Sequence, residues 1–147
     1  MTIGIEHLTL SELKSFLQEQ AEDAFPSLRD EEKLNELAEK WHNHAEFCIC
    51  RNAETQLVGM IAFYANQPKS KVAYIPHVYV SPKYRRRGIF IGMLNLIEKA
   101  IIQDGFSKIC LEVNNSNINA KETYLKYGFE IYKEASNESI YMTKHLI

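Results

Sequence analysis

Hydrophobic residues recur along this chain at two spacings, and each spacing predicts one kind of secondary structure. Within residues 10–24, apolar side chains lie three or four positions apart, which predicts an amphipathic helix. The same spacing predicts a second helix through Trp41, a third over residues 89–103 and a fourth over residues 117–127. Each of these patterns leaves one polar face, so the helices are expected to cover a core rather than to lie inside it.

Alternation of apolar and polar residues, or a short apolar run, predicts strands between and after these helices. The predicted strands cover residues 3–8, 47–51, 56–64, 72–80, 108–113, 129–135 and 139–144. The run Leu57–Phe63 is almost entirely apolar, which favours a central position in the sheet. Hairpins near both ends of the chain, with helices between them, favour an α+β fold in which helices cover one largely antiparallel sheet.

Pro76 lies inside the strand predicted over residues 72–80. Proline has no amide hydrogen to donate to a neighbouring strand, so it favours a bulge or an unpaired position. The alternative is that Pro76 marks the end of the strand. The sequence leaves both interpretations open.

The composition is typical of a globular protein and changes this picture little. The chain has 147 residues, of which 46% are hydrophobic and 24% are charged, and we expect a single domain over residues 1–147. The net charge of -2 does not favour nucleic acid as a partner. No stretch is apolar enough to cross a bilayer and the first residues do not resemble a secretion signal, so we expect a cytoplasmic protein that does not bind membranes.

The cysteines Cys48, Cys50 and Cys110 also favour a reducing compartment. Cys48 and Cys50 form a close pair, but a lone pair without a second pair of ligands is weak evidence for a metal site. We therefore expect buried cysteines and no bound metal.

The stretch from Val78 to Gly92 carries the strongest chemical signal. A strand runs to Val80, Ser81-Pro82 ends it, three arginines and Gly88 follow, and a helix starts at once. Amides at a helix start attract anions, glycine admits a close ligand, and arginine suits phosphate. These features predict a site for a phosphate-bearing cofactor. The alternative is a solvated basic turn before an ordinary helix.

Two segments resemble motifs of the GNAT N-acetyltransferase superfamily. Arg85-x-x-Gly88, after a valine strand and a proline turn, resembles the acetyl-CoA pyrophosphate loop, written Gln/Arg-x-x-Gly-x-Gly/Ala, although Phe90 replaces the last small residue. The second segment is similar to the family's Leu-Glu-Val…Asn-x-x-Ala-x-x-Leu/Phe-Tyr-x-x-x-Gly-Phe pattern, with Thr123 in place of the apolar residue before the tyrosine. It reads Leu111-Glu112-Val113, then Asn117-x-x-Ala120-x-x-x-Tyr124-x-x-x-Gly128-Phe129. The resemblance covers most of the chain from Val72 onward.

This resemblance implies a GNAT fold, which is a single mixed, mostly antiparallel sheet of six to seven strands, splayed between the fourth and fifth strands, with helices on both faces. It implies acetyl-CoA as the cosubstrate and no metal. The pyrophosphate would lie at the loop amides, and the pantetheine arm would run between the strands that end at Val80 and Val113. The residues assigned to acetyl-CoA by the resemblance are Val78, Tyr79, Val80, Arg85, Arg86, Arg87, Gly88, Ile89, Phe90, Ile91, Asn117 and Ala120.

The resemblance also implies catalytic roles for Tyr124 and Glu112. Tyr124 would be the general acid that protonates the departing thiolate, since thiols titrate near ~8.5 and tyrosine near ~10; the alternative is a packed aromatic ring. Glu112 would be the general base, because only a neutral amine attacks a thioester; the alternative is an exposed strand carboxylate. His77, which shares a strand face with Tyr79, and water are further candidates for the base, although a lone histidine is more often structural.

The resulting hypothesis is an N-acetyltransferase that moves an acetyl group from acetyl-CoA to a primary amine by direct attack in a ternary complex. The alternative is a non-catalytic acyl-CoA-binding sensor or interaction module of the same fold, which Phe90 slightly favours. The acceptor would be a small molecule or a peptide or protein amine, and the Leu-Glu-Val segment, which resembles that of protein N-terminal acetyltransferases, leans towards protein amines. We expect a monomer or a homodimer.

Overall fold

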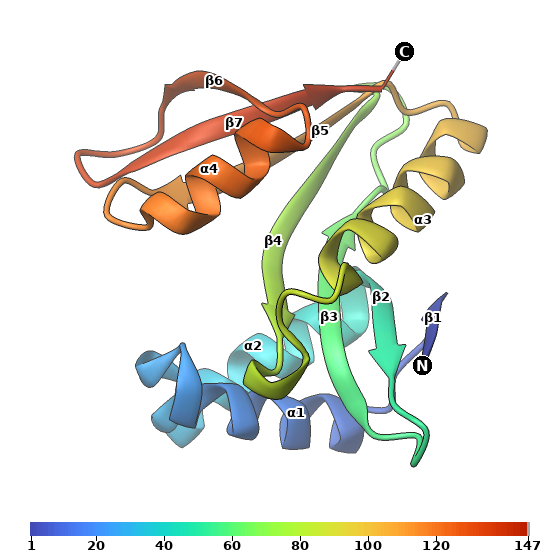
Figure 1. Cartoon of the computed structure of the whole chain (residues 1–147), viewed down its shortest axis with the longest axis vertical. Coiled ribbons are helices and arrows are strands. Elements are labelled where there is room, and N and C mark those ends of the chain that lie inside the picture. The colour runs from blue at the N-terminus through green and yellow to red at the C-terminus, as the bar shows by residue number, and fades with distance from the viewer. Residues whose placement is uncertain (147) are drawn as a thin grey trace. The chain divides into compact units, whose positions relative to one another are not determined.

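The computed structural model describes residues 1–146, in which seven strands join in one mixed sheet with the order β1-β2-β3-β4-β5-β7-β6 (Figure 1). The strands are β1 (Thr2–Ile5), β2 (Glu46–Arg51), β3 (Leu57–Tyr64), β4 (Val72–Val80), β5 (Lys108–Asn114), β6 (Glu130–Glu134) and β7 (Ser139–His145). The helices are α1 (Leu10–Asp23), α2 (Glu31–His44), α3 (Ile89–Gln103) and α4 (Ile118–Lys126), with the short 3-10 helices η1 (Pro26–Arg29) and η2 (Pro82–Tyr84). In the defined registers only β4 and β5 pair in parallel, so the predicted α+β fold with a mostly antiparallel sheet is confirmed.

Contacts divide the chain into two compact units. The first unit comprises residues 1–63 and 77–97, and the second comprises residues 64–76 and the chain from Glu98 onward. The boundary falls inside β4 and inside α3, so each unit contains part of both elements. The single domain that we expect from the sequence therefore remains a prediction.

The first unit contains the antiparallel strands β1, β2 and β3. Ile3 lies opposite Cys50 in one register, and Cys48 lies opposite Ile61 in the next. The interior of β3 is buried along its whole length, as its apolar run predicted. Cys48 and Cys50 are free and fully buried, which confirms the structural interpretation of this pair.

Polar side chains start the first two helices. The amide of Glu12 donates to Thr9 Oγ1 at 3.1 Å, and the amide of Glu32 donates to Asp30 Oδ1 at 3.0 Å. Both caps satisfy amides that have no acceptor inside the helix. α1 packs against α2 and η1, and its apolar face is buried, with Leu13 and Leu17 fully enclosed.

The second unit is arranged around β5. This strand pairs in parallel with the first part of β4 and antiparallel with β7, which in turn pairs with β6. Ile109, Leu111 and Val113 are buried, whereas Glu112 and Asn114 are exposed, so the two predicted faces of this strand are confirmed. The polar face of β5 therefore carries the candidate base.

Pro76 lies in the middle of β4, and the strand continues to Val80, so the interpretation in which proline ends the strand is wrong. Burial alternates through Pro76 without a break. Within residues 1–146 the register of β4 with β5 ends at Ile75 and Leu111, directly before the proline. Pro76 thus lies where this pairing stops, which suits a residue with no amide hydrogen.

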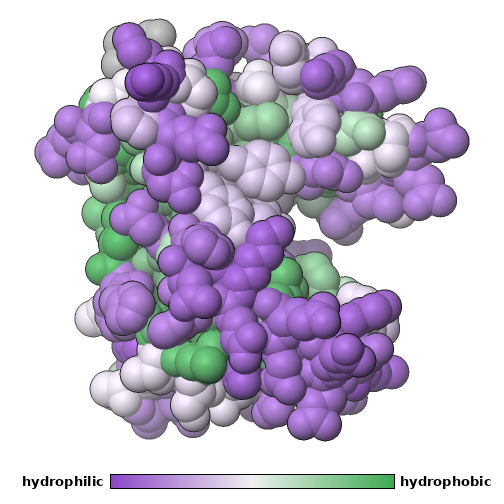
Figure 2. Space-filling model, turned by 180° about the vertical axis from the view of Figure 1, so that it is seen from behind, coloured by the Kyte–Doolittle hydropathy of each residue, from purple (hydrophilic) through white to green (hydrophobic). Residues whose placement is uncertain are grey.

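The surface is mostly polar on the face shown in Figure 2, where hydrophobic areas are small and scattered. Among the described residues, no helix combines the length and the apolar character needed to cross a bilayer.

Candidate functional site

The loop between β4 and α3 contains two residues in the left-handed backbone region. The φ angles are 64° at Arg86 and 76° at Gly88. The amide of Gly92 donates to the Gly88 carbonyl at 3.0 Å, so α3 starts directly after the loop. The first amides of an α-helix have no acceptor inside the helix, and left-handed residues in a turn can gather amides around an anion. The loop is therefore suited to hold a phosphate group.

Gly88 is required for its backbone conformation rather than for lack of space. A Cβ atom at this position would meet Ile91 Cγ2 at 3.9 Å, which is ordinary van der Waals contact. A residue with a Cβ costs about 1–2 kcal/mol in the left-handed region, whereas glycine does not. The φ angle therefore explains the glycine at position 88, and its role in admitting a close ligand stays a prediction.

Arg85 is held within the first unit by three contacts. Its guanidinium forms an ion pair with Asp23 of α1, its Nε donates to the Val80 carbonyl at 2.8 Å, and it lies over the Tyr79 ring at 5.6 Å from the centroid. The Tyr79 hydroxyl also donates to Asp23, at 2.8 Å. Burial, and then the Asp23 carboxylate, raise the pKa of Tyr79 to about 12. Asp23 thus connects α1 to both the end of β4 and the loop.

Arg86 and Arg87 lie on the exposed side of the same loop. The Arg87 guanidinium lies over the Tyr84 ring, 5.3 Å from its centroid. Asn52 Nδ2 donates to the Tyr84 hydroxyl at 3.2 Å, which ties the loop to the β2–β3 turn. Two exposed arginines therefore stand beside the start of α3, where a phosphate would be attracted.

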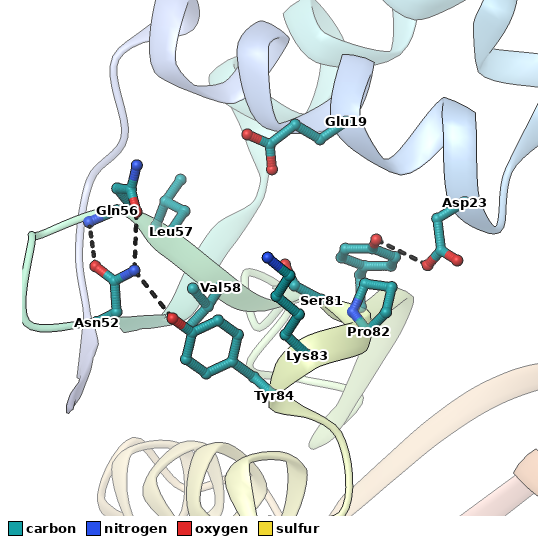
Figure 3. Close-up of a pocket in the computed structure, with 11 residues that line it drawn as sticks. Glu19, Asp23, Asn52, Gln56, Leu57, Val58, Ser81, Pro82, Lys83 and Tyr84 are labelled. Atoms are coloured by element: carbon teal, nitrogen blue, oxygen red, sulfur yellow. Dashed lines mark hydrogen bonds between the residues drawn. The ribbon is translucent and has the colours of Figure 1, made fainter.

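A cavity of about 400 Å³, lined in part by the first residues of this loop, lies within the first unit (Figure 3). Glu19 and Asp23 of α1 line it, and Lys83 extends towards it from η2. The ion pair with Arg85 already occupies Asp23. This arrangement indicates a mixed-charge cavity without a clear preference for a ligand of either sign.

His77 is buried in the first unit, where it accompanies Tyr79 on one face of β4 as predicted. Its Nε2 lies 2.5 Å from Gln20 Oε1, and its ring contacts Phe25 and Trp41 at centroid distances of 4.5 and 4.9 Å. Burial lowers the pKa of His77 to about 4. The imidazole is therefore neutral at pH 7 and enclosed, an environment that favours the structural interpretation of this residue.

In the second unit, Glu112 shares the polar face of β5 with groups from both neighbouring strands. Ser139 Oγ donates to Glu112 Oε2 at 2.6 Å. Tyr74 on β4 lies opposite Cys110, and burial, with the Glu112 charge as the next cause, raises the pKa of Tyr74 to about 12. Tyr141 lies directly opposite Glu112 in the β5–β7 register. Glu112 thus accepts a hydrogen bond from Ser139, and tyrosines lie on both neighbouring strands.

Glu112, Ser139 and Tyr74 line a polar cavity of about 340 Å³. Its walls are Tyr74, Pro76, Glu112, Asn114, Ser136, Glu138 and Ser139. Every wall residue except Pro76 carries a hydrogen-bonding side chain, and none carries a positive charge. A cavity of this kind suits a polar or cationic group.

Tyr124 lies half-buried on α4, and its ring contacts Phe129 at a centroid distance of 5.5 Å. Burial raises the pKa of Tyr124 to about 12. The phenol therefore retains its proton at neutral pH, as a general acid must, although it is a weaker acid than free tyrosine. Asn117 Oδ1 accepts from the Ala120 amide at 3.2 Å, so Asn117 caps the start of α4.

The other predicted residues differ in exposure. Ile89 is buried, and the half-buried ones are Val78, Val80, Phe90, Ile91 and Ala120. The first unit brings together the predicted residues from Val78 to Ile91, and the second unit contains Glu112, Asn117, Ala120 and Tyr124. Sequence reasoning missed Asp23 and Ser139, because each meets its partner only through tertiary structure. Within residues 1–146, no group of three or more metal-ligating side chains is placed to hold an ion.

Comparison with known proteins gives a family. The model of the acetyltransferase (GNAT) family matches residues 11–129, which is well over half of the chain. No curated protein matches the sequence.

Solved structures of known acetyltransferases have the same fold. A PaiA N-acetyltransferase from Thermoplasma acidophilum, in complex with coenzyme A, is 20% identical with a TM-score of 0.75, and the match covers 99% of each chain. A GNAT-family acetyltransferase from Staphylococcus aureus is 17% identical, with a TM-score of 0.76 and coverage of 99% of this chain and 100% of the other. The ribosomal-protein-S18-alanine N-acetyltransferase from Escherichia coli is 18% identical, with a TM-score of 0.75 and coverage of 99% and 94%.

The family match includes the loop after β4, the candidate carboxylate on β5 and the tyrosine on α4. This chain therefore belongs to the GNAT family of acetyltransferases and is an acyltransferase.

Proposed function

We propose that the protein transfers the acetyl group of acetyl-CoA to a primary amine, which attacks the thioester directly in a ternary complex. The observation that carries this proposal is the carboxylate of Glu112, which lines a polar cavity and accepts a hydrogen bond on one oxygen. Acetyl-CoA supplies the activated acetyl group when it is bound. The chain's own residues must then hold the diphosphate, remove a proton from the amine and supply a proton to the sulfur.

The loop before α3 provides the means to hold a diphosphate. Its left-handed residues Arg86 and Gly88 precede the helix start, and Arg86 and Arg87 are exposed beside it. The amides of Gly88 and Ile89 are the proposed donors to phosphate oxygens. Arg85 is proposed to support the loop, because its guanidinium is already paired with Asp23.

Glu112 is proposed as the general base. Most primary amines are protonated at neutral pH, since lysine titrates near ~10.4 and an α-amino group near ~8, and only the neutral amine attacks. A carboxylate can take the ammonium proton directly or through water. The cavity around Glu112 has no positively charged wall residue, so it does not repel an ammonium group.

Tyr124 is proposed as the general acid that donates its phenolic proton to the departing sulfur. Its pKa of about 12 keeps it protonated throughout the neutral range. Burial raises the pKa of a thiol as well, so a leaving group in an enclosed site is a better proton acceptor than a thiolate in water.

A thiol-release assay tests this proposal. The protein would be incubated with acetyl-CoA and a panel of peptides, polyamines, amino sugars and aminoglycosides, with free thiol measured over time. We expect release with at least one class of amine and a loss of about 100-fold or more in turnover for Glu112→Gln. Binding of acetyl-CoA without thiol release for any amine would favour the alternative, a non-catalytic acyl-CoA-binding module. No binding of acetyl-CoA, measured as an unchanged melting temperature, would contradict both functions.

A further inference from the structure

The hydroxyl groups of Ser136 and Ser139 form a directed chain of hydrogen bonds that ends on Glu112. Ser139 Oγ donates to Glu112 Oε2 at 2.6 Å, and the two serine oxygens lie 2.9 Å apart. The amide of Glu138 donates to Ser136 Oγ at 3.1 Å. An ionised carboxylate can only accept hydrogen bonds, so Ser139 donates its single hydroxyl proton to Glu112. Ser139 must then accept the proton of Ser136, and the chain runs from the Glu138 amide to the carboxylate.

Strand pairing and burial hold this chain in place. Ser139 opens β7, lies opposite Asn114 and is 6% exposed. Its carbonyl accepts the amides of Ala135 and Ser136 at 3.0 and 3.2 Å, which closes the β6–β7 turn. Glu112 lies opposite Tyr141, two residues further along β7, so Ser139 is its diagonal neighbour on the same face of the sheet. The serine hydroxyl is therefore presented to the carboxylate by the register itself.

We propose that Ser139 is a positioning residue for Glu112, and that Ser136 orients the Ser139 hydroxyl. This inference rests on the proposed function, in which Glu112 is the base. One oxygen of the carboxylate is occupied by Ser139, which fixes the side-chain rotamer and leaves the second oxygen to take the proton of the amine. Chained hydrogen bonds strengthen each other, so the bond from Ser136 reinforces the bond from Ser139 to the carboxylate.

The experiment compares steady-state kinetics of Ser139→Ala and Ser136→Ala with those of the unmutated protein. For Ser139→Ala we expect kcat to fall about 10- to 100-fold with little change in the KM for acetyl-CoA. Ser136→Ala should show a smaller fall in kcat, and Ser139→Thr, which keeps the hydroxyl, should restore most of the rate.

Controls separate positioning from a structural role. Ser70→Ala removes an exposed loop hydroxyl that donates to the Gln67 carbonyl at 2.9 Å in the same unit, and it should leave kcat unchanged. In a Glu112→Gln background, Ser139→Ala should have no further effect if it acts through the carboxylate. If Ser139→Ala lowers the melting temperature too far to be assayed, Ser136→Ala and Ser139→Thr carry the same test.

The possible failures are distinguishable. If Glu112→Gln abolishes turnover but both serine variants keep the kcat of the unmutated protein, the positioning role is overturned and the proposed function stands. If Glu112→Gln keeps full turnover, Glu112 is not the base, so its proposed role and the positioning role of Ser139 both fail while acetyl transfer itself stands. An equal additional loss for Ser139→Ala in the Glu112→Gln background would show that Ser139 acts independently, which also overturns its positioning role.

Discussion

Asp23 on α1 and Arg85 in the loop before α3 form an ion pair, although 62 positions separate them in the sequence. The same carboxylate accepts the Tyr79 hydroxyl, and the same guanidinium donates to the Val80 carbonyl. Arg85 is therefore committed to contacts within the first unit. This arrangement assigns support of the loop to Arg85 and leaves Arg86 and Arg87 exposed.

These contacts predict different effects for the arginines. Arg85→Ala should lower the unfolding free energy by about 0.5–1 kcal/mol, the range of a partly exposed ion pair, as measured by urea denaturation. Arg86→Ala combined with Arg87→Ala should leave stability within about 0.5 kcal/mol but weaken acetyl-CoA binding roughly 10-fold, as measured by calorimetry. If the double variant binds acetyl-CoA tightly and Arg85→Ala loses much of its affinity, then Arg85 binds the cosubstrate and the assignment is wrong.

Gly88→Ala should destabilise the protein through its backbone alone. The φ angle is 76° and the nearest atom to a new Cβ is 3.9 Å away, so strain rather than overlap sets the cost. We expect a loss of about 1 kcal/mol in unfolding free energy, with weaker acetyl-CoA binding because the loop shifts to relieve the strain.

Gly4→Ala is the matched control for this change. A Cβ at Gly4 would meet nothing within 4 Å, and Gly4 lies in β1 without a positive φ angle. It should cause little or no loss of stability. Equal losses in the two variants would show that the left-handed angle of Gly88 carries no energetic weight.

Tyr124→Phe should keep acetyl-CoA binding and lose about 100-fold or more in kcat, because the leaving sulfur loses its proton donor. The pKa of Tyr124 is raised to about 12, so the phenol stays protonated far above neutral pH. A general acid must be protonated to act, so Tyr124 should cause no fall in rate on the basic side below about pH 11. If kcat falls near pH 9 in the unmutated protein and this fall is absent in Tyr124→Phe, the raised pKa of Tyr124 is contradicted.

Stability should decrease in mild acid because of His77. Burial lowers its pKa from 6.5 to about 4, so the unfolded chain binds a proton on His77 before the folded protein does. The stabilising contribution is complete above pH 6.5 and is lost as the pH falls towards about 4. Urea denaturation should show a loss of about 2 kcal/mol from this residue between about pH 8 and pH 5.

Two histidine variants test this assignment. His77→Gln removes the titrating group and should flatten the pH dependence, while the exposed His145→Gln should leave it unchanged. If the unfolding free energy depends on pH equally in His77→Gln and in the unmutated protein, another residue causes the loss of stability in acid.

Local signals in the sequence were sufficient for most of the fold. The alternation in β5 correctly placed Glu112 on the polar face, and the glycine at position 88 correctly marked the turn into α3. Both signals depend on residues close together in the chain, where periodicity and backbone preference act directly. The effect of Pro76 was ambiguous, because it depends on which neighbouring strand stops pairing there and not on residues close in the chain.

The side chains that contact Glu112 and Arg85 could not be predicted from the sequence. Ser139 reaches Glu112 only because the β5–β7 register places it two residues from the opposing Tyr141. Asp23 reaches Arg85 only because α1 packs near the end of β4. Both contacts depend on a register or a packing angle, which serine and aspartate do not encode by their type or spacing.

The most direct test of the proposed cosubstrate site is a crystal structure of the protein grown with coenzyme A. We expect diphosphate oxygens within hydrogen-bonding distance of the amides of Gly88 and Ile89, with Arg86 or Arg87 beside them and Arg85 still paired with Asp23. Coenzyme A bound elsewhere, with no phosphate oxygen near the start of α3, would contradict it.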